Sequence, residues 1–453
     1  KRPRMLTVEP FFTELRAAEY PRLDQVGEAY LDFTGSALYS NRQIDTHSSR
    51  LKTSVFGNPH SENGPSRAST DAIDRARAAV LDFLDASPDD YAVCFTANTS
   101  AAIKLVAESY PFGSGRGLVL SADNHNSMNG IRQFACTRGA ALKYLSLDDE
   151  LMLSAPIDEL RRHRGESGGL FGYPAQSNFS GVKHSLDLIA SSQELGYDVI
   201  LDAAAYLPTN RLSLRRHPAD FVVFSGYKIL GFPTGVGALV ARRDKLAMLT
   251  RPWFAGGTVE YASVQHETHL LRPAEHGAFE DGTPAFLSIA ALADGFEMLC
   301  EIGMENVNRH VAKLTDYMET RLRELRRRDR EDLVTIYGPS GMRNRGATIS
   351  FNVLRGDGTA IPFGEVEDRA RAAGVSLRGG CFCNPGAAEA AFGFPLEVTA
   401  SCLKTVGESG FSIESFSSCL GREIAVGAVR ASIGIPTSVR DVDRAIQVVA
   451  SFA

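Results

Sequence analysis

The sequence predicts an α/β protein with a large domain, built on a mostly parallel seven-stranded sheet, and a smaller α+β domain. Short apolar runs alternate with helical patterns through the first part of the chain. These runs lack polar alternation, which is typical of strands in a parallel sheet covered on both faces. After about residue 285 long helical patterns take over, and this change indicates the second domain.

Seven segments of the first part have the composition of buried strands, and a helix is expected from Thr99 to Glu108. The strands are expected at 91–95, 117–121, 141–145, 169–173, 198–202, 221–224 and 236–240. Each is a run of four or five mostly apolar residues, the length of a sheet strand. We expect the large domain to span 31–285.

The second part should form the small domain, from residues 1–30 and 286–453. Helices are expected at 286–302, 307–328, 363–373 and 439–452. Strands are expected at 347–353, where apolar and polar residues alternate, and at 429–433. The Ser-rich stretch 401–421 is interpreted as a loop or insertion.

The composition excludes several classes of protein. The chain has 453 residues, with 48 Lys plus Arg and 54 Asp plus Glu, for a net charge of −6. This balance argues against nucleic-acid or membrane-surface partners, which favour basic proteins. Seven cysteines are few and odd in number, so reduced thiols in the cytoplasm are expected. No apolar run approaches the roughly 18 residues of a membrane span.

Three weaker motifs have ordinary explanations. Gly113–Gly117 resembles a phosphate loop, but it precedes a strand and is interpreted as a turn. His266 and His269 do not lie at the i, i+4 spacing of a zinc-binding helix, so no metal is expected there. The pair Cys381 and Cys383 lacks a second Cys/His pair, which favours reactive thiols over zinc.

Two charged residues follow buried strands in the middle of the chain. Asp202 ends one strand, and Lys228 follows the strand 221–224 and precedes a glycine-rich turn. Asp202 could simply cap a helix. Ligands, however, bind at the carboxyl ends of parallel strands, and burial lowers the pKa of a lysine and frees its amine for Schiff-base chemistry. This pair is what pyridoxal phosphate requires, since a carboxylate keeps the pyridine nitrogen protonated.

Further residues upstream suit the same cofactor. The segment 96–100 opens a helix after a strand and carries hydroxyls, as a phosphate site requires. His125 follows another strand end and could stack on a ring, although by itself it would more often be a structural histidine.

The chain resembles the class V group of fold-type I pyridoxal-phosphate enzymes, the cysteine desulfurases, and is most similar to the desulfurase domain of molybdenum cofactor sulfurases. The resemblance runs in order from about residue 28 to 450. It is carried by the segments 57–61, 123–127, 176–181 (Gln-Ser-Asn-Phe-Ser-Gly), 227–235, 279–283 and 380–386 (Gly-Cys-Phe-Cys-Asn-Pro-Gly). We do not expect the chain to include the C-terminal domain that eukaryotic cofactor sulfurases carry.

The resemblance implies a role for each matching residue around the ring. Lys228 is the Schiff-base lysine, Asp202 pairs with the ring nitrogen, His125 stacks on the ring and Asn178 lies near the ring hydroxyl. The residues implied to bind phosphate are Thr99, Ser100, Ser225 and Tyr227, with Gly282 and Thr283 reaching across the interface of a homodimer.

It also implies the substrate site and the sulfur carrier. Arg430 matches the arginine that binds the substrate carboxylate, a bidentate task suited to guanidinium. Cys383 matches the thiol that becomes persulfidated, and the small residues around it suit a swinging loop. Cys381 is the weaker candidate, and an ordinary loop thiol at 383 is the alternative.

The implied activity is the transfer of sulfur from L-cysteine to Cys383 with release of L-alanine, followed by donation to an unknown acceptor in a cofactor or small-molecule pathway. Lys228 would move the Cα proton and His125 would assist. Another class V reaction on an amino acid, such as C–S lysis, decarboxylation or transamination, remains open and would not need Cys383. A catalytically silent sulfur-relay protein is disfavoured because Lys228, Asp202 and Arg430 are all present.

Overall fold

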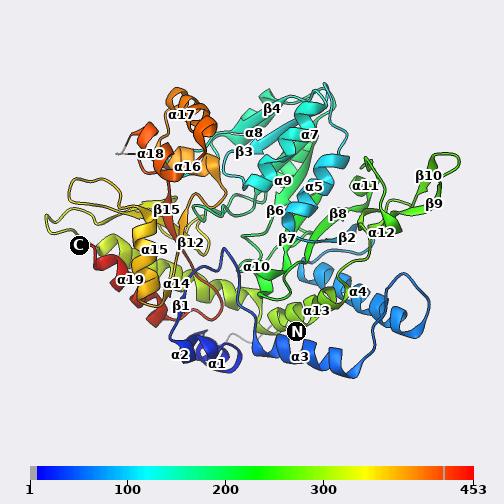
Figure 1. The fold of residues 1–453 in the computed structure, drawn as a ribbon, viewed down its shortest axis with the longest axis horizontal. Helices are drawn as coiled ribbons and strands as arrows, with labels where there is room; N and C mark the ends of the chain where they lie inside the picture. Colours follow the sequence, from blue (N-terminus) through cyan, green and yellow to red (C-terminus); the bar gives the residue numbers. More distant parts are fainter. Residues whose placement is uncertain (1–7, 422–423) are drawn as a thin grey trace.

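A seven-stranded sheet forms the centre of the larger part of the molecule (Figure 1). The computed structural model describes residues 8–421 and 424–453. In spatial order the strands are β2 (Tyr91–Thr96), β8 (Gly237–Arg242), β7 (Phe221–Ser225), β6 (Tyr197–Asp202), β5 (Gly169–Pro174), β3 (Gly117–Ser121) and β4 (Leu142–Leu145). β8 is antiparallel to β2 and β7, and the other pairs are parallel. The predicted mostly parallel sheet is confirmed.

Both faces of this sheet are covered, which explains the apolar runs. Every residue of β3, β5, β6 and β7 is buried. One apolar cluster joins one face to α4 (Gly64–Phe83), α8 (Pro156–Arg162), α9 (Leu188–Glu194) and α13 (Phe286–Ile302). A second cluster joins the opposite face to α5 (Thr99–Ser109), α6 (Asn126–Asn129) and α7 (Ile131–Thr137). Two-sided burial removes the need for polar alternation.

A four-stranded antiparallel sheet forms the second unit, in the order β11 (Val334–Tyr337), β12 (Thr348–Val353), β15 (Ala428–Ser432) and β14 (Arg378–Gly380). Its helices are α14 (Met304–Glu324), α15 (Phe363–Ala372) and α19 (Val439–Ala450). The N-terminal segment, with α1 (Val8–Glu19) and α2 (Arg22–Val26), ends in β1 (Ala29–Tyr30), which pairs in parallel with β13 (Val375–Ser376).

The remaining elements are short or lie at the edges. They are α3 (Asn41–Thr53), α10 (Gly226–Leu230), α11 (Arg243–Leu246), η1 (Gly256–Thr258), β9 (Val259–Ser263), β10 (Thr268–Leu271), α12 (His276–Phe279) and α16 (Pro385–Phe392). No helix among the described residues is both long and apolar enough to cross a membrane.

One strand and one helix predicted in the second unit are present, with shifted ends. The strand predicted at 347–353 is β12, and all six of its residues are buried. Its polar face is covered because Ser350 Oγ donates to Phe179 O at 2.6 Å and the Thr348 and Thr34 hydroxyls lie 2.7 Å apart. The helix predicted at 307–328 is α14, which starts at Met304 and ends at Glu324.

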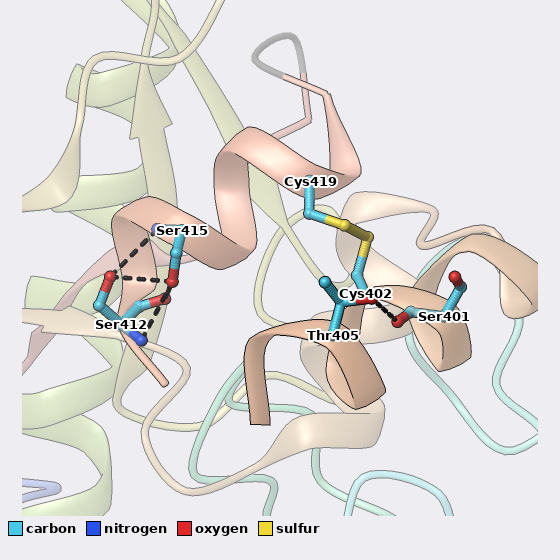
Figure 2. Close-up of a disulfide and its surroundings, with 6 residues drawn as sticks. All are labelled: Ser401, Cys402, Thr405, Ser412, Ser415 and Cys419. Carbon is cyan, nitrogen blue, oxygen red and sulfur yellow. Dashed lines mark hydrogen bonds between the residues drawn. A yellow bond between two sulfur atoms is a disulfide. The ribbon is translucent and has the colours of Figure 1, made fainter. Parts of the chain in front are cut away.

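The Ser-rich stretch is helical and not a loop (Figure 2). It folds into α17 (Leu396–Ser409) and α18 (Ile413–Leu420), and the Ser412 side chain caps α18. Cys402 and Cys419 form a disulfide with their Cα atoms 5.7 Å apart, which corrects the expectation that all thiols are reduced. Phe416 and Leu420 bury with Cys402 in a small apolar cluster. The other five cysteines are free.

Candidate active site

A cavity of about 230 Å³ lies at the carboxyl ends of β6 and β7. It brings together eight residues that the sequence analysis assigned to the cofactor: Thr99, Ser100, His125, Asn178, Asp202, Ser225, Tyr227 and Lys228. Asn98, Ser127, Pro174, Gln176, Ala204 and Ala205 complete its lining. Residues from five separate loops meet here because parallel strands end at one edge of the sheet.

The N-terminus of α5 forms one end of the cavity. Asn98 caps this helix by accepting a hydrogen bond from Ala101 N at 2.9 Å. The Thr99 hydroxyl lies 2.6 Å from Ser225 Oγ, and Ser225 Oγ also accepts from Thr99 N at 2.8 Å. A helix N-terminus that carries hydroxyl groups can bind an anion.

The backbone around this helix start is tightly enclosed. A Cβ on Gly237, at the start of β8, would lie 2.4 Å from the carbonyl carbon of Asn98. Only glycine therefore lets β8 approach the turn that precedes α5. The Ser100 hydroxyl lies 2.6 Å from Ser127 Oγ. This hydrogen bond connects the segment that carries His125 to the N-terminus of α5.

Lys228 and Asp202 lie on neighbouring strand ends. β6 and β7 pair so that Asp202 is opposite Val223, and Lys228 lies on α10 directly after β7. Burial lowers the pKa of Lys228, and the nearby Asp202 carboxylate partly opposes this shift. No hydrogen bond holds the lysine amine within the described part of the chain, whereas Asp202 Oδ1 accepts from Ala204 N at 3.0 Å. An amine with a lowered pKa and a hydrogen-bonded carboxylate therefore line the same cavity.

His125 lies at the edge of this site. Its Nδ1 accepts a hydrogen bond from Ser127 N at 3.1 Å, which places it at the N-terminal end of α6. Burial lowers the pKa of His125, and the Asp202 carboxylate opposes the shift. A half-buried imidazole whose pKa is lowered can stack on an aromatic ring or accept a proton.

Arg430 is buried on β15 and takes part in a cluster that the sequence analysis missed. Its Nη2 donates to Asp32 Oδ1 at 3.0 Å and its Nη1 donates to Asn178 O at 2.9 Å. Arg378, directly opposite Arg430 across the β14–β15 pair, also donates to Asp32, with Nε 2.9 Å from Oδ2. Burial lowers the pKa of Arg430. Neither Asp32 nor Arg378 stands in a local motif that would have revealed it.

The thiol of Cys383 is exposed and lies beside the site, whereas Cys381 is half-buried. Charge on Cys383 acts on the pKa of Lys228, although less than burial, the Asp202 carboxylate, Arg430 and Arg378 do. The Cys381 thiol donates to Val426 O at 3.0 Å, and burial raises the pKa of Cys381 to about 11. The two thiols therefore differ, and Cys383 is the more available nucleophile.

Gly282 and Thr283 do not line this cavity within one chain. Thr283 lines a neighbouring cavity of about 320 Å³ with Phe95, Thr96 and Ala97. The Asn58 side chain donates to Thr283 Oγ1 at 3.4 Å. The family role of these two residues would require a second copy of the chain.

The donor set fits pyridoxal phosphate. The helix N-terminus with Thr99 and Ser225 suits a phosphate, Lys228 supplies the amine for a Schiff base, and the buried Asp202 carboxylate suits a protonated ring nitrogen. Arg430 has an Nε without a partner among the described residues, so a carboxylate could still bind there.

Comparison with known proteins agrees with this geometry. Molybdenum cofactor sulfurase of Solanum lycopersicum is 35% identical, over 97% of this chain and 57% of that protein. The Bos taurus protein of the same name is 35% identical, over 94% of this chain and 50% of its own length. The chain thus spans little more than half the length of these relatives.

Solved structures share the fold. The cysteine desulfurase of Thermococcus onnurineus NA1 superimposes with a TM-score of 0.79 at 24% identity, covering 97% of each chain. The cysteine desulfurase CsdA of Escherichia coli gives 0.76 at 18% identity, covering 97% of this chain and 98% of that one. The aminotransferase class-V family matches residues 29–445, and the chain belongs to this family.

Proposed function

We propose that this chain is a pyridoxal-phosphate enzyme that removes sulfur from L-cysteine, holds it as a persulfide on Cys383 and releases L-alanine. The observation that carries the proposal is one cavity with Lys228 and Asp202 at adjacent strand ends and an exposed thiol, Cys383, beside it. The relatives named molybdenum cofactor sulfurase support it.

The chain's own residues would hold the cofactor at four points. Thr99, Ser100, Ser225 and Tyr227 would bind its phosphate, and Asp202 would bind its ring nitrogen. His125 would stack on the ring, and Asn178 would lie beside the ring hydroxyl. When bound, this cofactor withdraws electrons from the substrate Cα.

The substrate would be oriented by its carboxylate and deprotonated by an amine. Arg430 can bind a carboxylate with two parallel N–H groups. The pKa of Lys228 is lowered by burial, so more of its amine is neutral near pH 8 than in water, and it can accept the Cα proton.

The sulfur step balances without another reactant. The Cys383 thiolate forms an S–S bond to the substrate sulfur, and the Cβ–S bond breaks with its electron pair on carbon. A proton then adds to Cβ, so that L-cysteine and the Cys383 thiol become L-alanine and a Cys383 persulfide. The sulfur is oxidised to the sulfane level while the carbon is reduced.

The persulfide needs an acceptor, and the names of the relatives suggest one. We infer that the terminal sulfur passes to a cofactor of the molybdenum type, because the similar proteins are named sulfurases of that cofactor. A small-molecule acceptor with a nucleophilic centre would satisfy the same chemistry, because it can attack the terminal sulfur and release the Cys383 thiolate.

We also infer a homodimer. Thr283 does not line the Lys228 cavity of its own chain. The β9–β10 hairpin exposes Tyr261, Val264 and Leu270, which are 65%, 94% and 62% exposed. Apolar side chains this exposed are typical of a surface that a second chain covers. Light scattering of the purified protein should give twice the monomer mass, and a monomer that turns over L-cysteine would contradict the inference.

The function is tested by alanine release from L-cysteine. Wild type and Cys136→Ala, which removes another exposed free thiol, should both form alanine. Cys383→Ala and Lys228→Ala should not, and the Cys383 peptide of wild type should gain 32 Da. If Cys383→Ala still releases alanine, or pyruvate with sulfide, the alternative class V reaction holds.

A further inference from the structure

The cysteine loop, residues 381–384, is docked onto the site by its backbone carbonyls. Phe382 O accepts from Asn178 Nδ2 at 2.7 Å, and Cys383 O accepts from Asn126 N at 2.7 Å. Cys381 O accepts from Asn384 N at 2.9 Å. Three successive carbonyls are therefore satisfied, two of them by residues of the large domain. A loop expected to swing is held in one place.

The docked loop has an unfavourable backbone. Phe382 and Cys383 both have φ of 55°, in the left-handed region that disfavours side chains. Two such residues in succession need contacts that hold them. The Phe382 ring supplies one, because the Arg430 guanidinium lies 4.6 Å from its centroid and Phe179 packs at 5.4 Å.

Asn384 joins the loop to fixed parts of the site. Its Nδ2 donates to Asp123 O at 2.7 Å and to Asn178 Oδ1 at 2.9 Å, and the residue is fully buried. Asp123 is itself buried and accepts from His184 Nε2 at 2.8 Å. The two N–H groups of the Asn384 amide therefore connect Asp123, which follows β3, with Asn178, whose side chain binds Phe382 O.

Asn384 has a second, separable role. Its Oδ1 accepts from Ala387 N at 3.2 Å and so caps α16. The Asn384 side-chain oxygen therefore caps α16, and its nitrogen makes the two hydrogen bonds to the site. A substitution that keeps the oxygen and removes the nitrogen separates the two roles.

Asn178 connects this bridge to the substrate arginine. Its backbone oxygen accepts from Arg430 Nη1, while its side chain both accepts from Asn384 and donates to Phe382 O. The thiol carrier, the cavity wall and the arginine thus share one hydrogen-bonded residue.

We propose that Asn384 is a positioning residue that acts through Asn178 to hold the cysteine loop docked, with Cys383 directed at the substrate sulfur. The effect on catalysis rests on the proposed function, whereas the docking of the loop by Asn384 does not. The amide nitrogen of Asn384 is the group that the role requires.

The test uses Asn384→Asp and Asn384→Ser in the cofactor-loaded enzyme. Both keep an oxygen that caps α16 and lose both Nδ2 hydrogen bonds. Asn63→Asp is the matched control, because Asn63 caps α4 through its oxygen, accepting from Ser66 N at 3.1 Å, on an exposed part of the chain. Loss of the helix cap would also speed up hydrogen exchange in the peptides of α16. The exchange rate of α16 therefore distinguishes opening of the loop from unfolding of the helix.

Hydrogen exchange of the peptide 379–386 is the first readout. We expect it to speed up by about fivefold or more in both Asn384 variants, as for local opening, while α16 and the Asn63→Asp control stay at the wild-type rate. Exchange of 379–386 at the wild-type rate in both variants would overturn the proposal, whether or not the enzyme consumes L-cysteine.

Steady-state kinetics is the second readout. We expect kcat for alanine to fall by about tenfold to a hundredfold, as for a misplaced reacting group, with KM and the cofactor absorption band changed by less than about twofold. A higher KM with unchanged kcat would overturn the positioning role. If wild type releases no alanine, the proposed function fails while the exchange result still decides the docking.

Discussion

The Asp32 carboxylate accepts a hydrogen bond from the Arg430 guanidinium at 3.0 Å across a sequence separation of 398 residues. Arg378 donates to the same carboxylate, so one negative charge lies between two positive ones. Asp32 thereby offsets repulsion between the arginines and orients the Arg430 guanidinium, which we propose binds the substrate carboxylate.

We expect Asp32→Asn to raise KM for L-cysteine by about tenfold, because two charge-assisted hydrogen bonds that orient Arg430 and Arg378 are weakened. Initial rates across L-cysteine concentrations measure this. A lower KM would mean that Asp32 competes with the substrate for Arg430. Asp24→Asn, which removes a carboxylate paired with Arg16 instead, is the control.

Lys228→Met should stabilise the cofactor-free protein. Burial lowers the pKa of Lys228 in the folded state below its usual 10.5. Between the two pKa values the unfolded chain binds more protons, so wild-type stability rises with pH through that window. The advantage of Lys228→Met is therefore largest at neutral pH and shrinks toward pH 10.5. Urea unfolding of both proteins at pH 7 and pH 10 measures it, and an equal advantage at both would contradict the assignment.

The two loop thiols should react differently with iodoacetamide. Burial raises the pKa of Cys381 to about 11, whereas Cys383 is exposed. Because the thiolate is the nucleophile, Cys383 should be alkylated first at pH 8, and Cys381 should catch up only as the pH approaches 11. Peptide mass spectrometry over time follows both sites. Equal rates at pH 8 would show that Cys381 is not shielded.

Gly237→Ala should weaken cofactor binding. Its Cβ would lie 2.4 Å from the Asn98 backbone and push away the turn that carries Thr99. We expect the Kd for pyridoxal phosphate to rise by about tenfold or more, which corresponds to ~1.4 kcal/mol. Titration of the apoprotein measures the Kd. Gly113→Ala, where no atom lies within 4 Å of the added Cβ, should bind like wild type.

Reduction of Cys402–Cys419 should loosen α17 and α18 without stopping desulfuration. The bond closes a loop with a sequence separation of 17, and such loops contribute roughly 3 kcal/mol through the unfolded chain. Limited proteolysis between 396 and 421 should therefore speed up in dithiothreitol and in Cys402→Ser. Alanine release by Cys402→Ser should stay near the wild-type rate. If this variant released no alanine, the pair of helices α17 and α18 would belong to the catalytic machinery.

The local pattern of apolar residues was sufficient to predict the strands of the seven-stranded sheet and the polar residues that follow them. Buried strands such as 198–202 are read from short apolar runs, and a charged residue just after one, as at Lys228, falls at the edge of the sheet by geometry. The cavity brings Asp202, Lys228 and His125 together for this reason.

Contacts between segments far apart in the sequence leave no local pattern, so the sequence did not predict them. Nothing near Asp32 indicates that Arg430 lies beside it, and the serines of 401–421 suggested a loop although Ser412 caps a helix. The small residues around Cys383 suggested mobility, but Asn178, outside the loop, and Asn384, at the end of the loop, hold it through side-chain hydrogen bonds. The pairing of Cys402 with Cys419 likewise depends on how two helices meet.

The parallel pairing of β1 with β13 has a consequence for biosynthesis. Ala29 pairs with Val375, and Thr34 N donates to Ser432 Oγ, so the N-terminal segment cannot complete its contacts until Ser432 has left the ribosome. The seven-stranded sheet ends at Arg242 and can assemble earlier. A nascent chain could therefore contain the cavity with Lys228 before it contains Arg430, and the emergence of β15 from the ribosome would be the event that joins them.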